Sequence, residues 1–323
     1  MINLRYHIVS LVAVFLALGM GIVMGTTVID RVTVDALNNR LNDVQAAVND
    51  MRAANRRLTD EVKNGKDFAA QARDHLVDGE LRGVPVLVVA VSGVDRQPVD
   101  ALGEALVAAG ATVQGTVWFN PKMRLDSDGD ARALAAALGM PSPQSLTPTD
   151  RDAMRSTALD RIVRPRDGGS GTSGVLAALT TAGFLGYEAP AAVGSVSTSV
   201  PPIGSIPLPG TRYVVVSGAG AQVADDLVAA PFSQALAQSP GRLVAAEAGV
   251  DTPGGRGVFV GFLRGDTGVG TRLSTVDNLE SPMGQAAAVL ALRDLGAPRF
   301  GHFGVGPGAE RLVPDAPDTR PGS

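Results

Sequence analysis

A run of residues without a formal charge, from Ile8 to Ile29, constrains this chain more than any other feature of its sequence. As an α-helix rising 1.5 Å per residue, the run would extend about 33 Å, enough to cross a hydrocarbon core of roughly 30 Å. The apolar core of a secretory signal peptide is shorter, usually about 7–15 residues, and no clear A-x-A cleavage pattern is present. We therefore expect residues 1–30 to form an uncleaved, single-pass transmembrane anchor.

The charges that flank this segment predict its orientation. Arg5 precedes it with no acidic residue nearby, whereas Asp30 and Arg31 follow it. Because positively charged residues are enriched on the cytoplasmic side of membranes, we expect a cytoplasmic N-terminus. The remainder of the chain would then lie outside the cytoplasm, in the cell envelope.

A stripe of small residues runs along the predicted membrane helix. Its members follow one another in steps of four: Ala13, Ala17, Gly21 and Gly25. Small residues at this spacing let two helix backbones approach closely, so the stripe predicts helix packing within the membrane. The alternative is that Ala and Gly are simply common in membrane helices.

Two methionines, Met20 and Met24, also share one face of this helix. Thioether sulfur is a soft ligand that suits Cu(I), and two such groups would form half of a metal site. The alternative is that both are apolar side chains facing lipid. The pair is a weak metal-site hypothesis, and the chain has no other closely spaced methionine pair or HxxxH motif.

A heptad pattern follows the anchor. Apolar residues and one asparagine occupy its a and d positions: Val34, Leu37, Leu41, Val44, Val48, Met51, Asn55, Leu58 and Val62. The pattern predicts a coiled-coil stalk over residues 31–80. Asn55 at an a position favours parallel, in-register pairing, so we expect a homo-oligomer joined through anchor and stalk. The alternative is an amphipathic helix packed on the chain's own globular domain.

Residues 81–306 read as a globular α/β domain. Short valine-rich stretches typical of buried strands alternate with helical patterns, which favours a Rossmann-like, mostly parallel sheet. The predicted strands are 84–91, 112–118, 213–216, 243–246 and 258–262, and the predicted helices are 99–109, 150–162, 175–182, 223–237 and 282–295. Ser281 and Pro282 would cap and begin the last helix. Residues 307–323 look like a disordered, Pro/Gly-rich tail.

Composition excludes several classes of site. The chain has no cysteine, which removes disulfides, thiolate-bound zinc and cysteine nucleophiles. A net charge of −4 provides no basic footprint for nucleic acid. Three histidines, His7, His75 and His302, are the only imidazole groups. We expect no catalytic residues, no firmly bound cofactor and no nucleic-acid partner.

The turn at residues 217–221 (SGAGA), between a predicted strand and a predicted helix, is a candidate for a ligand loop. Val223 stands where GxGxxG requires its third glycine, and Asp225 and Asp226 would repel a phosphate. Ser217 and His302 could nominally belong to a catalytic triad, but Ser217 lacks the GxSxG context. An ordinary strand–helix turn is the preferred interpretation.

The segment 270–285 (GTRLSTVDNLESPMGQ) and the opening MINLRYHIVSLVAVFLALGMGIVMGTT are distinctive. Together they closely resemble the actinobacterial copper transport outer-membrane protein family, MctB, and the likeness covers essentially the whole chain. The resemblance implies a channel-forming cell-envelope protein that aids copper export, with copper as the transported ion and the outer membrane as its location. The short, uniformly apolar strands are not those of a transmembrane barrel, which alternate polar and apolar residues.

These observations leave three hypotheses for function. The leading one is a membrane-anchored, oligomeric envelope protein that contributes to copper efflux. The second is a structural or scaffold protein with a coiled-coil dimer and a non-catalytic α/β domain. The third is an enzyme domain that uses the carboxyl ends of the sheet, which predicts a polar pocket with shifted titrating groups rather than a flat loop surface.

Overall fold

The computed structural model describes residues 4–143, 146–163, 172–190, 202–239, 241–249, 258–297 and 299–315, without the side chains of 26–33 and 172–173. The chain divides into two compact units, Met1–Gly65 and Lys66–Ser323. The first unit is helical, and the second carries the sheet.

Helix α1, Leu4–Val77, is continuous over 74 residues. No proline occurs in this part of the sequence, so nothing removes a backbone donor or forces a kink. Within α1, Leu4–Gly25 has a mean hydropathy of 2.5 and is long and apolar enough to cross a membrane. The expected N-terminal apolar helix is confirmed, whereas its orientation and the coiled coil stay predictions.

A seven-stranded sheet with the order β3-β2-β1-β4-β5-β6-β7 organises the second unit. Neighbouring strands are parallel, except that β3 is antiparallel to β2. The strands are β1 (Pro85–Val91), β2 (Thr112–Phe119), β3 (Leu185–Glu188), β4 (Arg212–Gly218), β5 (Leu243–Ala248), β6 (Ser274–Val276) and β7 (His302–Phe303). The mostly parallel α/β sheet expected from the valine-rich runs is confirmed.

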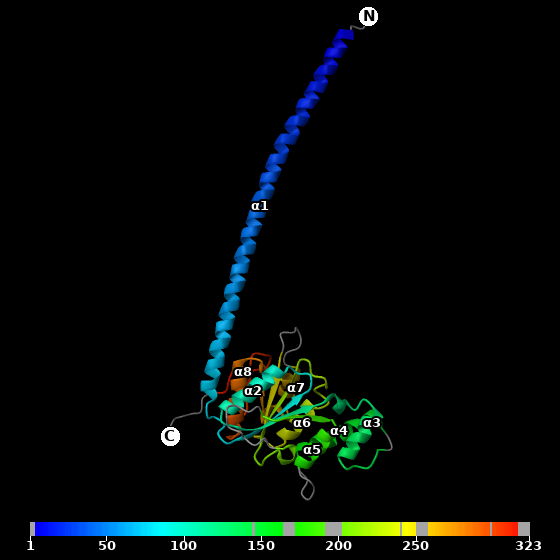
Figure 1. Cartoon of the computed structure of the whole chain (residues 1–323), viewed down its shortest axis with the longest axis vertical. Coiled ribbons are helices and arrows are strands. Elements are labelled where there is room, and N and C mark those ends of the chain that lie inside the picture. The colour runs from blue at the N-terminus through cyan, green and yellow to red at the C-terminus, as the bar shows by residue number, and fades with distance from the viewer. Residues whose placement is uncertain are drawn as a thin grey trace. The chain divides into compact units, whose positions relative to one another are not determined.

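Two groups of helices cover the two faces of this sheet (Figure 1). Helices α2 (Arg96–Ala108) and α8 (Pro282–Asp294) contact each other in one group. The other group comprises α3 (Asp128–Ala137), α4 (Pro148–Val163), α5 (Thr172–Thr181), α6 (Ala229–Ala237) and α7 (Val258–Gly265). Three short 3₁₀ helices lie in the connections: η1 (Pro121–Arg124), η2 (Ile203–Ser205) and η3 (Gly270–Arg272).

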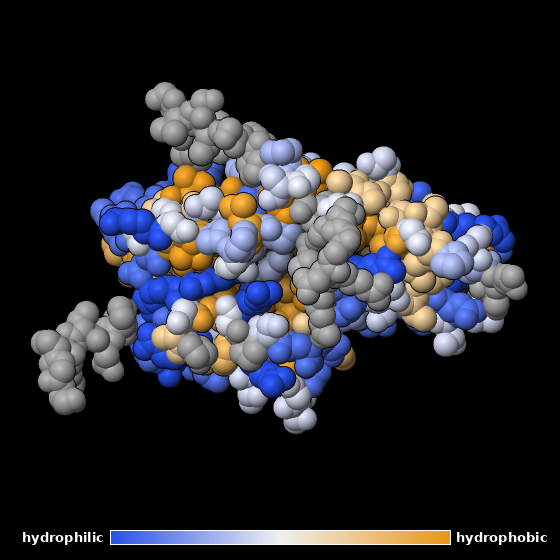
Figure 2. Space-filling model, turned by 90° about the horizontal axis from the view of Figure 1, so that it is seen from below, coloured by the Kyte–Doolittle hydropathy of each residue, from blue (hydrophilic) through white to orange (hydrophobic). Residues whose placement is uncertain are grey.

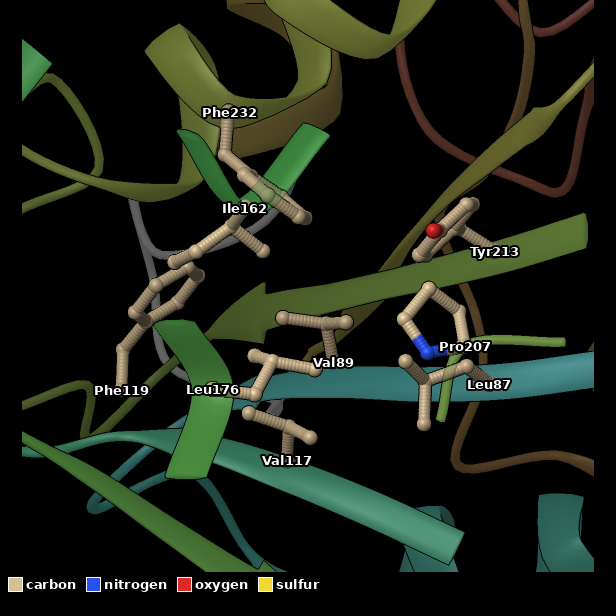
Figure 3. Close-up of a pocket in the computed structure, with 9 residues that line it drawn as sticks. All are labelled: Leu87, Val89, Val117, Phe119, Ile162, Leu176, Pro207, Tyr213 and Phe232. Atoms are coloured by element: carbon tan, nitrogen blue, oxygen red, sulfur yellow. The ribbon is translucent and has the colours of Figure 1, made fainter. Parts of the chain in front are cut away.

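The core on the α4–α6 side contains a small apolar cavity of about 10 Å³ (Figure 3). Its lining side chains are aliphatic or aromatic: Leu87, Val89, Val117, Phe119, Ile162, Leu176, Pro207, Tyr213 and Phe232. The Phe232 ring meets that of Phe119 edge-on, with centroids 5.4 Å apart. Burial raises the pKa of Tyr213 to about 12. A volume this small holds at most one water, so this region is packed core rather than a ligand site.

The surface of the second unit is mixed. Hydrophobic residues occur in patches separated by hydrophilic ones on the face seen in Figure 2. Single exposed apolar residues are normal on protein surfaces. Val258 and Phe262 differ from these because they are exposed together, four residues apart, on one side of α7.

One predicted strand is wrong, because residues 258–262 belong to helix α7. The run VFVGFL is apolar nearly throughout and therefore carries no clear period in the sequence. In the structure Phe259, Val260 and Leu263 are buried while Val258 and Phe262 are exposed, which is the spacing of a helix. The buried carboxylate of Glu247 accepts hydrogen bonds from the amides of Val258 and Val260 and anchors the first turn.

Other elements of the structure also differ from the predicted ones. The helix predicted over 223–237 begins only at Ala229, because Pro231 is tolerated in a first turn but not in a helix interior. The helix α3 and the strands β3, β6 and β7 were not predicted; β6 and β7 are three and two residues long, too short to produce an apolar run.

Part of the predicted tail has defined contacts. Within residues 307–315, the amide of Glu310 donates to the carbonyl of His302 over 2.7 Å, and Arg293 donates to the carbonyl of Asp315 over 2.9 Å. Residues 316–323 of the predicted tail lie outside the described residues. The structure therefore differs from the disordered tail that composition predicted over its first nine residues, 307–315.

Candidate functional site

Open α/β sheets bind ligands outside the carboxyl ends of their strands, where the strand order reverses. Here that point lies between β1 and β4, since β2 adjoins β1 on the other side. A Cβ on Gly93 would lie 2.2 Å from the carbonyl oxygen of Gly220, and the amide of Gln222 donates to the carbonyl of Ser92 over 2.7 Å. The two loop backbones therefore fill the crevice that a dinucleotide would occupy.

A cleft of about 720 Å³ opens next to this contact, where β4 and β5 end. Its wall combines the glycine-rich turn at 218–221 with an apolar group and an acidic group of side chains. These are Val223, Ala224, Ala230, Val258 and Phe262 in the apolar group, and Asp225, Asp226 and Glu247 in the acidic group. The volume falls in the range of small-molecule sites, roughly 300–1,000 Å³. This edge of the sheet is hollowed rather than flat.

The fold shifts the pKa of Asp225, a carboxyl group in the wall of this cleft. Burial raises its pKa above the usual value, the hydrogen bond from Ser217 opposes that shift, and the charge of Asp226 adds to it. The Ser217 hydroxyl donates to Asp225 Oδ1, so this serine holds the turn rather than serving as a free nucleophile.

Ser217 and His302 are not brought together. Ser217 lies on β4 and His302 on β7, three strand spacings apart, or roughly 14 Å. His302 Nδ1 instead lies 3.0 Å from Thr275 Oγ1. The sheet geometry therefore provides no catalytic triad from these two residues.

A smaller cleft of about 260 Å³ lies on the other side of the Gly93–Gly220 contact. Arg96 forms an ion pair with Glu188 at 2.6 Å, and its guanidinium carbon is 4.9 Å from the centre of the Trp118 ring. The Trp118 indole donates to Glu188 over 3.0 Å. The charged groups here pair with one another, and Trp118, the only tryptophan, is a buried reporter of folding in this unit.

The distinctive segment 270–285 builds a buried polar network rather than an open site. Asp277 is 1% exposed and accepts hydrogen bonds from Arg264 at 2.8 Å and from the amides of Val305 and Gly306 at 2.7 and 3.0 Å. A Cβ on Gly304 would lie 2.1 Å from Asp277 Oδ1. This buried ion pair ties together β6, α7 and the loop after β7.

The second half of the segment starts helix α8. Ser281 accepts a hydrogen bond from the amide of Gly284 over 3.0 Å and Pro282 occupies the first turn, so the predicted cap is confirmed. A Cβ on Gly284 would lie 2.0 Å from the carbonyl oxygen of Asn278. The chain therefore needs a glycine at this point to let the turn and the helix approach.

Gln285 connects this segment to the end of α1 within the second unit. Its side-chain oxygen accepts a hydrogen bond from Arg73 over 2.6 Å, and its nitrogen donates to the carbonyl of Leu279 over 3.3 Å. The segment thus holds the last turns of α1 against α8. The distinctive residues of this segment are therefore explained by the contacts that assemble the domain.

The candidate residues of the membrane helix all lie on α1. A Cβ on Gly21 or Gly25 would meet nothing within 4 Å, so both positions are open to a close neighbour. Met20 and Met24 are exposed one turn apart. The helix packing role and the metal role of these residues stay predictions.

The predicted coiled-coil positions are exposed as well. The apolar side chains among them range from 37% exposed at Val48 to 66% at Met51. Within the part of the chain that the structure describes, no group of three or more His, Cys, Asp or Glu side chains is arranged to hold a metal ion.

Comparison with known proteins identifies the family of this chain. The family model described as "Copper transport outer membrane protein, MctB" matches residues 1–314. The chain belongs to this family. The protein named copper transporter MctB of Mycobacterium tuberculosis is 27% identical over 323 residues, covering 96% of this chain and 98% of the relative. The copper transporter MctB of Mycobacterium leprae is 29% identical over 328 residues, covering 97% and 99%.

Membership of the MctB family agrees with the resemblance found from the anchor and the 270–285 segment. The named relatives are copper transporters rather than enzymes. Because the match extends over nearly the full length of each relative, it covers the apolar helix, the stalk region and the α/β domain together.

Sequence analysis missed several residues of the clefts and the buried network. Glu247 lies in an otherwise apolar strand, and Phe262 lies in a segment predicted as a strand. The four-residue step between Val258 and Phe262 is the one signal that favours a helix with an exposed face. The Arg264–Asp277 pair joins two elements, so no spacing along the sequence indicates it.

We predict that Gly284→Ala lowers the free energy of unfolding of the second unit by about 1–3 kcal/mol, because the added methyl overlaps the Asn278 carbonyl. Urea unfolding followed by Trp118 fluorescence measures this. The control is Gly103→Ala in α2, where a Cβ meets nothing within 4 Å. That change should be neutral or stabilise by up to about 1 kcal/mol. Equal effects at both positions would contradict the account of α8.

We predict that Asp225→Asn raises the thermal unfolding temperature at pH 7. A carboxyl whose pKa is raised by folding stabilises the fold most below its unfolded value near 3.8, and this contribution is lost as pH rises through the folded pKa. Asparagine stays uncharged at every pH, so the variant does not lose this stability as the pH rises. Its side-chain oxygen can still accept the Ser217 hydrogen bond. The advantage over wild type should shrink as the pH is lowered toward 4. Trp118 fluorescence reports the transition. A variant that unfolds at a lower temperature than the wild type at pH 7 would contradict the prediction.

Proposed function

We propose that this protein is a membrane-anchored, oligomeric cell-envelope protein that contributes to copper export. The observation that carries the proposal is the family match over residues 1–314, together with relatives named as copper transporters. The apolar segment Leu4–Gly25 supports membrane attachment. Copper is the transported ion in this proposal and is not a resident cofactor.

In the proposed topology, the N-terminus is cytoplasmic and the α/β domain lies outside the cytoplasm. Arg5 before the apolar segment supports this orientation. The family description adds the outer membrane as the location. Separation of inner and outer membranes from cells that express the protein tests the location directly.

Self-association through α1 is the second part of the proposal. The exposed a and d side chains form an apolar stripe between Val34 and Val62 that a second copy would remove from water. The stripe of small residues in the anchor would allow the same two helices to approach in the membrane. In this arrangement residues 1–30 are the anchor, 31–80 the stalk and 81–306 the exported domain.

The path for copper in this proposal runs between associated anchors. Met20 and Met24 are the soft ligands of this segment, and several copies of the pair would place thioether sulfurs around one axis. Apart from Ser10, the other side chains between Ile8 and Gly25 are apolar, and His7 lies at the N-terminal edge of this segment. The channel hypothesis therefore depends on the two methionines.

A scaffold function is the second candidate, and a specific observation favours it. Among the described residues no cluster of metal-binding side chains is present, and the 270–285 segment serves to assemble the domain. In this alternative the anchor and stalk position a non-catalytic α/β domain in the envelope.

We predict that the fragment 30–80 is a parallel dimer and that Asn55→Val changes its assembly. A buried asparagine at an a position specifies the dimer at a cost in stability, so valine should raise thermal stability and permit larger oligomers. Analytical ultracentrifugation gives the oligomer size, and circular dichroism gives the melting temperature. A monomeric wild-type fragment would contradict the coiled coil.

We predict that Met20→Leu with Met24→Leu lowers copper export without lowering the amount of protein. In a strain that lacks its own MctB-family gene, the wild-type chain should reduce cell copper and the double variant should not. Met51→Leu is the matched control, because it makes the same substitution at a stalk d position. Cell copper is measured by mass spectrometry.

The outcomes of this experiment separate the two candidates. Unchanged export in the double variant would leave the methionines as lipid-facing side chains. A wild-type chain that changes neither copper content nor copper tolerance would count against transport and favour the scaffold.

A further inference from the structure

The proposed function does not use the 720 Å³ cleft at the ends of β4 and β5. Its mouth is formed on one side by α7, where Val258 and Phe262 are 59% and 53% exposed. Ala224, which is also exposed, lines the same cleft. An apolar body entering this cleft would cover aromatic and aliphatic surface that now faces water.

The polar side chains of this cleft are all acidic. Asp225 and Asp226 follow the glycine-rich turn, and Glu247 lies near the end of β5. The lining contains no Lys, Arg or His among the residues that the structure describes. Glu247 already accepts hydrogen bonds from two amides of α7, whereas Asp226 is exposed at the rim.

The combination selects the charge of a ligand. An anion such as a phosphate would be repelled by the carboxylates of Asp225 and Asp226, and the nearby crevice between β1 and β4 is closed by the Gly93–Gly220 contact. A cationic group would be attracted and would form a charge-assisted hydrogen bond with an exposed carboxylate. Surface carboxylates alone would not define a site, but here they border an apolar cleft of ligand size.

We propose that this cleft binds a small organic cation, an ammonium or guanidinium group attached to an apolar body. The apolar body would lie against Val258 and Phe262, and the cationic group would face Asp226 and Asp225. The volume suits a small molecule, whereas a protein partner needs about 800 Å² of contact on each side. This site is independent of copper transport and of the oligomer, and it lies in the second unit alone.

Three probes with one apolar body test the charge selection. These are 4-phenylbutylammonium, 4-phenylbutanol and 4-phenylbutyrate, titrated at pH 7 into the full chain in nanodiscs of zwitterionic lipid. Isothermal titration, with empty nanodiscs subtracted, should show that the ammonium binds at least about fivefold more tightly than the alcohol and that the carboxylate binds most weakly. Equal affinities, or tighter binding of the carboxylate, would overturn the proposal.

Two pairs of variants locate the binding. Asp226→Asn should weaken the ammonium about three- to tenfold, and Asp100→Asn, which removes an equally exposed charge from α2, should not. Phe262→Ser should weaken all three probes, and Leu312→Ser, at a position 52% exposed outside the cleft, should not. Trp118 fluorescence verifies that each variant is folded. Equal losses within either pair would place the binding elsewhere and refute the site.

Discussion

An apolar surface that must leave water governs the organisation of this protein. Helix α1 runs unbroken from Leu4 to Val77 and exposes apolar side chains along most of its length. Over Leu4–Gly25 a bilayer can solvate them on all sides. Beyond the membrane the exposed residues narrow to an a/d stripe, which lipid cannot cover and a partner helix can. One helix therefore requires two different environments in succession.

The α/β domain buries its apolar residues within its own fold. Strands β1, β4 and β5 are buried between two helix layers, and the Arg264–Asp277 pair holds the outer strands to α7 and the last loop. Removing one member of such a pair would leave a buried charge uncompensated, which is costly. The 270–285 segment thus assembles the domain of this chain, and it does not identify a copper site. In the two proposals, copper passes between the anchors and the cleft of the α/β domain binds an organic cation.

The parts of the fold that could be predicted are those governed by local chemistry. Valine-rich runs predicted β1 and β4, the uncharged run predicted the apolar start of α1, and Ser281–Pro282 predicted the start of α8. Residues 258–262 were assigned to a strand because a continuously apolar run has no period, and the sequence does not show that Glu247 of the preceding strand β5 binds the first turn of α7. The cleft could not be predicted for the same reason: β4, β5 and α7 meet there only after the chain has folded.

Cross-linking in the membrane tests the central claim, that the α1 stripe pairs with the same stripe of a second copy. The chain has no cysteine, so one cysteine can be introduced at a time into the full-length protein. A cysteine at Val48, an a position, should form a covalent dimer under mild oxidation, because in-register parallel helices bring the two copies of that residue together. A cysteine at Ala53, on the outer face, should not. Equal cross-linking at both positions, or none at Val48, would contradict the account.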